Sequence, residues 1–317
     1  METIVIALGG NAIIKAKEFT SVYDQFARTR QAMDNLVEIF KRGYNFVLTH
    51  GNGPQVGNIL IRVEASGDKA YPIPLGVAVA QTQGEMGYMI AQVLSNEFVR
   101  EGIRRDIVCV LTQVLVDPNE DSVQNPTKFV GPVYEDQHQV DRLLERGVRL
   151  KMDQGRGMRR VVPSPTPLSI IERDSILRLL QSGVIVVACG GGGMPVYHES
   201  DGTLEGIDGV IDKDLASAVL AREITAHKLV IVTGVKKVAS GWGTPQQVDH
   251  DILSLSQAKR LLDDGEFPPG NMGPKIQAAI EFLEHGGRKV LITDIEDIVP
   301  AFEGRAGTLI VPDHTPF

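Results

Sequence analysis

Three lysines stand beside helix-breaking residues instead of on an amphipathic helix face. Lys128 follows Asn-Pro-Thr, Lys213 lies between two aspartates, and Lys275 follows Asn-Met-Gly-Pro. Transfer of a phosphoryl group requires positive charge around the transferred group and little covalent help from the protein. These lysines are therefore candidates for neutralising phosphate charge, although each could be an ordinary surface lysine. Asp214 could hold the lysines in place, or it could only cap the helix that follows.

Glycine-rich turns offer a second kind of group that binds phosphate, the backbone N–H. They occur at Gly9-Gly10-Asn11, at Gly51-Asn52-Gly53 and in the run from Gly190 to Gly193, which includes Gly191 and Gly192. Each turn follows an apolar, strand-like run. Open α/β sheets bind ligands at the carboxyl ends of parallel strands, where such N–H groups suit a phosphoryl or carboxylate group. One such turn alone has a simple backbone explanation, but three together predict a shared ligand crevice.

Two familiar nucleotide motifs do not account for these turns. The sequence has no GxxxxGK[ST] string, which excludes a P-loop. The segment from Gly51 to Gly57 resembles a dinucleotide-binding fingerprint with one extra residue. However, residues 67–74 have the composition of a loop, where that fold requires a second strand ending in an acidic residue. The sequence therefore disfavours a dehydrogenase.

The elements that would position these groups alternate between strand and helix. Strands are predicted at residues 3–8, 45–49, 107–113, in the apolar run before Gly190, and at 228–233, 289–293 and 308–311. Helices are predicted from residue 23 to the glycine at 43 and at 56–64, 78–101, 139–146, 169–181, 215–223, 255–263 and 274–284. This order is typical of a parallel sheet covered by helices on both faces.

The middle of the chain breaks this alternation. Residues 118–167 are rich in proline, glycine and charge, with one short helix expected near 139–146. We interpret the segment as an inserted subdomain, or lid, that protrudes from the sheet and closes over a substrate.

Composition limits the classes of function. The chain has 317 residues with a net charge of −8, which argues against nucleic acid as a partner. No apolar stretch is long enough for a membrane span, and the start METIVIALGG lacks the features of a signal peptide. The two cysteines are expected to be buried thiols in a reducing cytoplasm. The histidines and cysteines show no zinc-site spacing, so no metal ligand is predicted.

Several strings resemble those of the carbamate kinases, members of the amino-acid-kinase family. They are IALGGNAI, THGNGPQVGN, QNPTKFVGP, DQGRGMRRVVPSP, IVVACGGGGMPV, GVIDKDLAS and GNMGPKIQAAI, in family order along nearly the whole chain. The resemblance implies a three-layer αβα sandwich with a mostly parallel open sheet and a protruding subdomain, usually as a homodimer. It implies that ADP and carbamoyl phosphate are converted reversibly to ATP and carbamate, with Mg²⁺ brought by the nucleotide, in arginine metabolism. Residues 1–215 would form the lobe that binds carbamate or carbamoyl phosphate, and residues 216–317 the nucleotide lobe.

The same resemblance implies roles for single residues. The first two glycine turns would surround carbamate and the phosphoryl group, through Gly9, Gly10, Asn11, Gly51, Asn52 and Gly53. Lys128 would reach in from the subdomain, Lys213 and Lys275 would neutralise phosphate charge, and Asp214 would organise the lysines. The nucleotide would contact Gly191, Gly192, Thr233, Gly234, Trp242, Met272 and Gly273. Most other members have a lysine where this chain has Ala7, and Lys213 would supply the missing charge.

Some assignments stay open. Met158 stands where relatives typically have tryptophan, which leaves the packing of the lid undetermined. Arg156, Arg159 and Arg160 could bind substrate phosphate or pair with acidic residues such as Asp153. His50 could touch the substrate or make a structural hydrogen bond, and Trp242 could lie near the adenine or cover the core. Two alternative functions are a kinase for another small acid and a sensor that binds these ligands without turnover.

Overall fold

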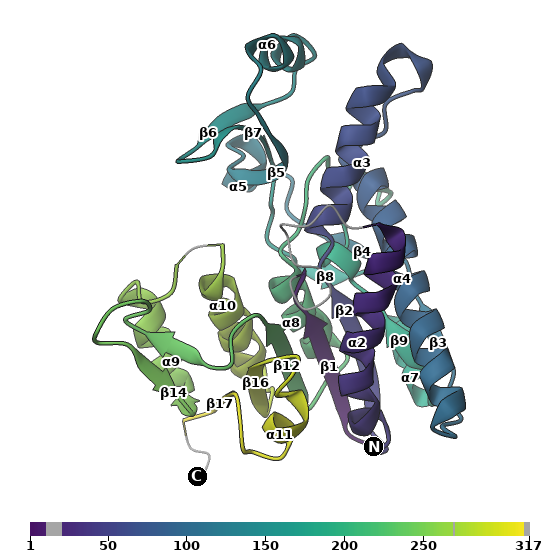
Figure 1. Ribbon diagram of the computed structural model, residues 1–317, viewed down its shortest axis with the longest axis vertical. Coiled ribbons are helices and arrows are strands. Elements are labelled where there is room, and N and C mark those ends of the chain that lie inside the picture. Colours follow the sequence, from purple (N-terminus) through teal and green to yellow (C-terminus); the bar gives the residue numbers. More distant parts are fainter. Residues whose placement is uncertain (11–20, 269, 314–317) are drawn as a thin grey trace.

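The computed structural model describes residues 1–10, 21–268 and 270–313, and its centre is an eight-stranded sheet (Figure 1). The strand order is β15-β17-β16-β12-β1-β2-β9-β3. All neighbouring pairs are parallel except β16 and β17. The strands are β1 (Thr3–Leu8), β2 (Asn45–His50), β3 (Ile107–Cys109), β9 (Ile185–Val187), β12 (Lys228–Thr233), β15 (Ile252–Ser254), β16 (Lys289–Asp294) and β17 (Thr308–Val311).

Helices cover both faces of this sheet. Alternate side chains of β1 point to opposite faces, so Ile4 and Ile6 pack in one core cluster and Val5 and Ala7 in another. The first cluster includes residues of α2 (Val22–Phe40), α4 (Leu75–Arg100) and α11 (Ile298–Phe302). The second includes residues of α7 (Arg173–Gln181), α8 (Lys213–Glu223), α9 (Leu255–Asp263) and α10 (Met272–Glu284). The predicted three-layer αβα sandwich is confirmed.

Residues 118–167 form the protruding subdomain, which stands at the end of the molecule opposite the N-terminus (Figure 1). We expected mostly loop with one helix. The structure instead has a three-stranded antiparallel sheet, because the polar and glycine-rich segments pair with one another. Its elements are α5 (Asp121–Gln124), β5 (Lys128–Tyr134), α6 (Gln137–Glu145), β6 (Leu150–Asp153) and β7 (Gly157–Val162), and β5 packs against α3 (Gly53–Ser66).

Two predicted elements are wrong because tertiary pairing overrides the local pattern. Residues 107–113 do not form one strand: the chain leaves the main sheet after β3, and β4 (Gln113–Leu115) joins a second sheet. The helix predicted at 169–181 begins only at α7. Before it, β8 (Ser169–Ile170) pairs with β4, and the carboxylate of Glu223 accepts hydrogen bonds from both residues of β8. The second sheet is completed by β10 (Met194–His198) and β11 (Leu204–Gly206).

The C-terminal half continues the same sheet. The expected boundary at residues 215 and 216 falls in the first turn of α8, and β12 of one half pairs with β1 of the other. The turn-rich stretch around Trp242 is a hairpin of β13 (Val238–Ser240) and β14 (Val248–His250). Short 3-10 turns lie at Gly67–Lys69 and Gly190–Gly192. Within the described residues, no helix has the length and apolar character needed to cross a membrane.

Candidate active site

The first two glycine turns touch each other at the carboxyl ends of β1 and β2. A Cβ on Gly9 would lie 2.7 Å from the carbonyl oxygen of Val232, and a Cβ on Gly51 would lie 3.0 Å from the backbone nitrogen of Gly10. Real Cβ atoms essentially never show the first distance and rarely show the second, so a side chain at either position would force the backbone to shift. The parallel register of β12, β1 and β2 therefore brings turns that are far apart in sequence to one place. Asn11, the last residue of the first turn, lies outside the described residues.

The third glycine run packs against the second turn. A Cβ on Gly191 would lie 2.0 Å from the side-chain nitrogen of Asn52, and one on Gly192 would lie 2.3 Å from the carbonyl oxygen of Ile211. Both glycines also have positive φ, 65° and 94°. Gly191 and Gly192, which we expected beside the nucleotide, thus lie between the second turn and the segment that leads to Asp212.

The N-termini of two helices at this edge have no side-chain cap. Helix α3 begins at Gly53, yet its N-cap residue Asn52 gives no side-chain cap and instead donates to the Thr82 hydroxyl at 2.8 Å. Helix α10 also lacks a side-chain cap at Asn271. Uncapped N–H groups and the helix dipole favour a bound anion. The ends of α3 and α10 can therefore accept phosphate or carboxylate oxygens.

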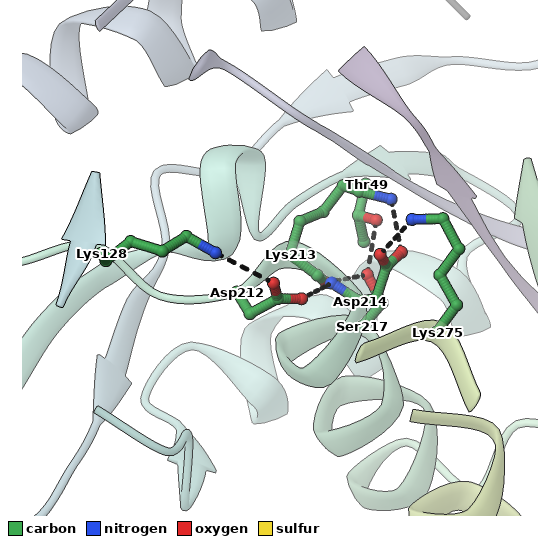
Figure 2. A network of polar contacts seen from close by, with 7 residues as sticks. All are labelled: Thr49, Lys128, Asp212, Lys213, Asp214, Ser217 and Lys275. Carbon is green, nitrogen blue, oxygen red and sulfur yellow. Dashed lines mark hydrogen bonds and ion pairs between the residues drawn. The ribbon is translucent and has the colours of Figure 1, made fainter. Parts of the chain in front are cut away.

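Asp214 joins two of the predicted lysines (Figure 2). Its Oδ1 lies 2.6 Å from Nζ of Lys213 and its Oδ2 lies 2.8 Å from Nζ of Lys275. The Asp214 residue is only 4% exposed. Burial alone would raise the pKa of its carboxyl, but the two ammonium groups overcome this and lower it to about 2. The carboxylate is therefore ionised at neutral pH and fixes both lysines.

Lys128 reaches the same cluster from the subdomain, but through a different carboxylate. Its Nζ lies 3.4 Å from Oδ2 of Asp212, whereas Oδ1 of Asp212 accepts the backbone N–H of Asp214 at 3.0 Å. Asp212 thus caps α8 and contacts Lys128 at once. We call Lys128, Asp212, Lys213, Asp214 and Lys275 the Asp214 cluster.

Two hydroxyl groups tie the Asp214 cluster to the sheet, and sequence reasoning did not select either of them. The Ser217 hydroxyl donates to the Lys213 carbonyl oxygen at 2.7 Å, and it lies 2.6 Å from the Thr49 hydroxyl at the end of β2 (Figure 2). The spacing of Ser217, one helical turn after Lys213, is the sequence feature that could have identified it. These bonds hold the start of α8 against β2.

Four expected nucleotide contacts lie in the C-terminal half. Thr233 ends β12 and is buried, while Gly234 after it is exposed. Met272 and Gly273 form the first turn of α10, where a Cβ on Gly273 would lie 3.1 Å from the Pro268 carbonyl oxygen. The C-terminal candidates therefore occupy a strand end and a helix start.

Trp242 is the fifth nucleotide candidate of the C-terminal half. It is 58% exposed at the tip of the β13–β14 hairpin, so it does not cover the core.

His50 is fully buried behind the glycine turns. Its Nδ1 lies 3.1 Å from the Gly51 carbonyl oxygen, while its Nε2 has no hydrogen-bond partner in the described part of the chain. Burial lowers the pKa of the imidazole to about 4, and the charge of Lys213 contributes to the lowering. A Cβ on Gly190 would lie 2.4 Å from Nε2. His50 is therefore a neutral side chain that fills the space between the second and third turns.

The three arginines of the subdomain face carboxylates. Arg159 pairs with Asp153 at 2.8 Å, Arg156 is largely exposed and lies 4.0 Å from the same carboxylate, and Arg160 lies 4.0 Å from Asp208. Met158 packs with Tyr134 inside the subdomain. The interpretation of these arginines as partners of acidic residues agrees with this geometry.

The described residues contain no group of three or more His, Cys, Asp or Glu side chains that could hold a metal ion. Both oxygens of Asp214 already face ammonium groups. The site thus combines fixed ammonium groups, helix N-termini without side-chain caps and glycine turns, and its described residues place no carboxylate or imidazole as a general base. Such a site suits a phosphorylated substrate whose nucleophile is already anionic.

Comparisons with known proteins extend over almost the whole chain. The family model described as "Amino acid kinase family" matches residues 2–294. A carbamate kinase of Pyrococcus horikoshii is 42% identical over 98% of this chain and 99% of its own length. A carbamate kinase-like protein of Escherichia coli K12 is 44% identical with the same coverage. The structure of carbamate kinase from Giardia lamblia bound to AMP-PNP is 40% identical, with a TM-score of 0.92 over 98% of this chain and 99% of that chain.

Proposed function

The chain belongs to the amino acid kinase family, and we propose that it is a carbamate kinase, which transfers a phosphoryl group reversibly between carbamoyl phosphate and ADP. The observation that carries this proposal is the Asp214 cluster, two lysines fixed by one buried carboxylate beside three glycine turns. Such a site suits several small acids. Sequence identities of 42% and 43% to carbamate kinases, over 98% of this chain, favour carbamate among them.

The reaction requires no general base. An oxygen of the ADP β-phosphate attacks the phosphorus of carbamoyl phosphate, the bond from phosphorus to the carbamoyl oxygen breaks, and carbamate leaves as an anion. In reverse, the carbamate oxygen is already a nucleophile. The protein must hold donor and acceptor in line and stabilise the charge on the transferred group.

We assign that stabilisation to the Asp214 cluster. Lys213 and Lys275 contact the transferred phosphoryl group and the nucleotide phosphates, and Asp214 positions both ammonium groups before the substrates bind. A carboxylate with a pKa of about 2 does not exchange protons at neutral pH, which supports a positioning role. Because the groups are fixed in advance, little reorganisation is needed in the transition state.

The substrates occupy different sides of the cluster in this proposal. Carbamate and the phosphoryl group are bound by N–H groups of the first two turns, including Gly10 and Gly53, whereas the Gly51 N–H donates to the Leu8 carbonyl oxygen and holds the second turn against the first. The nucleotide lies over the C-terminal half, between Thr233 and Gly234 on one side and Met272 and Gly273 on the other, with Trp242 near the base. Gly191 and Gly192 pack against Asn52 and against the segment before Asp212 and so hold both in position. Their tight contacts are the basis for this role.

Lys128 connects the subdomain to this chemistry. It is the first residue of β5 and contacts Asp212 at 3.4 Å, so a movement of the subdomain moves a cation at the site. We propose that this subdomain acts as a lid, which excludes water from the phosphoryl group and brings Lys128 to the substrate.

Magnesium does not fit as an ion held by the protein alone, since the described residues offer no suitable group of ligands. We propose that Mg²⁺ enters bound to ADP or ATP and neutralises phosphate charge there.

We also propose that the protein is a cytoplasmic homodimer that acts in arginine metabolism. Two free cysteines fit a reducing compartment, and a sedimentation measurement would test the dimer.

The decisive assay is ATP formation from ADP with carbamoyl phosphate, acetyl phosphate or N-acetylglutamyl phosphate as donor. We expect the highest kcat/KM with carbamoyl phosphate, and a kcat in Lys213→Ala that is lower by about 10²–10³-fold. A preference for another donor would identify a kinase for a different small acid. Tight binding of ADP and carbamoyl phosphate without any turnover would identify a sensor instead.

A further inference from the structure

A groove of about 590 Å³ lies on the sheet face that carries α11, at the amino ends of β12 and β16. We call it the α11 groove. It lies between α11, which is near the N-terminus in Figure 1, and the face of β16, β17 and β15. The lid is at the opposite end of the molecule in that view. None of the lining residues belongs to the Asp214 cluster or the glycine turns.

The walls of the α11 groove are strongly basic. Four cations line it, Lys228, Lys237, Lys289 and Arg305, and Asp251 is the one carboxylate among its described lining residues. The chain as a whole has a net charge of −8, so this concentration of positive charge runs against the charge of the protein. A concave basic surface of this kind attracts anions.

Two of the four cations form ion pairs, and the other two have no carboxylate partner among the described residues. Lys237 pairs with Asp251, and Arg305 pairs with Glu303. Lys228 and Lys289 occupy matching positions on the parallel strands β12 and β16, and neither forms an ion pair with a carboxylate of the described chain. Two unpaired ammonium groups side by side repel each other, and an anion between them would remove that repulsion.

Lys228 is the more constrained of the two. Its Nζ lies 4.3 Å from the centre of the Phe302 ring, so an aromatic face covers one side of the ammonium group. Burial, together with the charges of Lys289 and Arg42, lowers the pKa of Lys228 to about 8, and the charge of Glu2 offsets only part of this effect. No carboxylate of the described residues lies within ion-pair distance of the Lys228 ammonium group, and the more distant Glu2 compensates its burial only in part.

The floor of the α11 groove is apolar. Leu291 of β16 is paired with Leu309 of β17, which is paired with Ile252 of β15, so the three side chains share one face of the sheet. Ile252 is 43% exposed there. With Phe302 at its side, the floor can accommodate a flat or apolar group beside the cations.

From this geometry we infer a second ligand site: the α11 groove binds a small organic anion, with its phosphate or carboxylate group between Lys228 and Lys289 and its apolar body over Leu291 and Leu309. The site is separate from the active site. Six residues of β12 lead from Lys228 to Thr233, a distance of about 17 Å along the strand. A ligand in the α11 groove therefore does not occupy the phosphoryl-transfer site.

Pyridoxal 5′-phosphate is a suitable probe, because it combines a phosphate, a flat ring and an aldehyde. The aldehyde forms an imine with an unprotonated lysine amine and releases water, and borohydride reduces the imine to a stable amine. A lysine with a lowered pKa reacts preferentially. We expect peptide mapping to find Lys228 labelled first outside the active site, and inorganic phosphate to protect it more than sodium chloride at equal ionic strength.

Substitutions of single lysines test where the anion binds. Lys289→Met should reduce labelling of Lys228 about fivefold, the loss of roughly one charge-assisted contact. Lys259→Met is the matched control, because Lys259 is exposed and pairs with Glu284 elsewhere, and labelling should stay unchanged. Labelling of Lys228 no faster than that of exposed Lys69 would overturn the inference. Equal protection by chloride and phosphate would also overturn it, because the amine would then be reactive without an anion site.

Discussion

The Asp214 cluster and the α11 groove collect lysines at opposite ends of the same parallel sheet. In the Asp214 cluster, Lys213 and Lys275 share one buried carboxylate, and Lys128 contacts a second one. In the α11 groove, Lys228 and Lys289 occupy matching positions on adjacent strands, and neither forms an ion pair with a carboxylate of the described residues.

The difference shows two ways in which a protein prepares cations for an anion. Where a carboxylate fixes the ammonium groups, their charge and position are present before any substrate binds, as in-line phosphoryl transfer requires. Where the ammonium groups only repel each other, the ligand itself must supply the compensating charge. We therefore expect substitutions in the Asp214 cluster to change catalysis, and substitutions in the α11 groove to change ligand binding alone.

The largest effect is expected for Asp214→Asn, which leaves the lysines of the Asp214 cluster without their carboxylate, as in the α11 groove. Turnover should fall by at least about 10³-fold, because both ammonium groups lose their position. The free energy of unfolding should fall by roughly 3–5 kcal/mol, since two charges remain buried without a partner. Steady-state kinetics and urea denaturation measure the two effects, and a variant with wild-type turnover would contradict the positioning role.

Lys213→Ala and Lys275→Ala should follow. Each removes one cation from the transferred phosphoryl group, so kcat should fall by about 10²–10³-fold while the melting temperature changes little. The matched control is Lys259→Ala. Near-normal turnover in either cluster variant would exclude the proposed mechanism.

Acidic pH should destabilise the protein around the Asp214 cluster, because His50 is buried beside Lys213. The described lining of the α11 groove contains no histidine. The ordinary pKa of histidine is about 6.5, and burial lowers that of His50 to about 4. Protonation therefore favours the unfolded chain, and stability is lost as pH falls from about 6.5 towards 4, up to roughly 3 kcal/mol. Urea denaturation across this range should show a shallower pH dependence for His50→Gln, and identical slopes would refute the assignment.

Lys128→Met should have a smaller effect. Lys128 contacts Asp212 at 3.4 Å and its side chain is 38% exposed, so it is less fixed than the two inner lysines. We expect kcat/KM for carbamoyl phosphate to fall about tenfold, the loss of one charge-assisted contact. Lys69→Met provides an exposed control, and an equal loss there would show a general effect of surface charge.

The smallest effect is expected for Lys228→Met. With saturating substrates, kcat should stay within about twofold of the wild type, because the side chain lies at the far end of β12 from Thr233. Measurement of kcat with and without inorganic phosphate checks this. A fall in kcat as large as that expected for Lys213→Ala would show that the α11 groove also contributes to catalysis, which contradicts the proposed difference between it and the Asp214 cluster.

Much of the site was predictable because its chemistry is local in sequence. The glycine turns follow apolar runs, and Asp212-Lys213-Asp214 stands at a helix start, where the structure places it. The residues that contact these groups were harder to predict from the sequence. We expected Asp214 to organise all the lysines, yet Lys128 contacts Asp212, and neither Thr49 nor Ser217 stood out before the fold was known.

The fold shows the same division. The helices that pack on the main sheet were mostly found from their apolar spacing, because burial of one face imposes a period of about 3.6 residues. The antiparallel sheet of the protruding subdomain was missed, since short polar strands carry little periodic signal and depend on pairing with one another.

The sequence alone determined which residues can carry phosphate chemistry and the parallel sheet whose strand ends collect them. Only the tertiary structure decided which charges meet: Lys275 lies 61 residues from Asp214, and Lys128 lies 84 residues from Asp212. It also decided, through the register of β12 and β16, that Lys228 and Lys289 stand together without an ion pair to any described carboxylate. Propensity and spacing act over a few residues, whereas these contacts depend on how strands and helices pack, which no local pattern encodes.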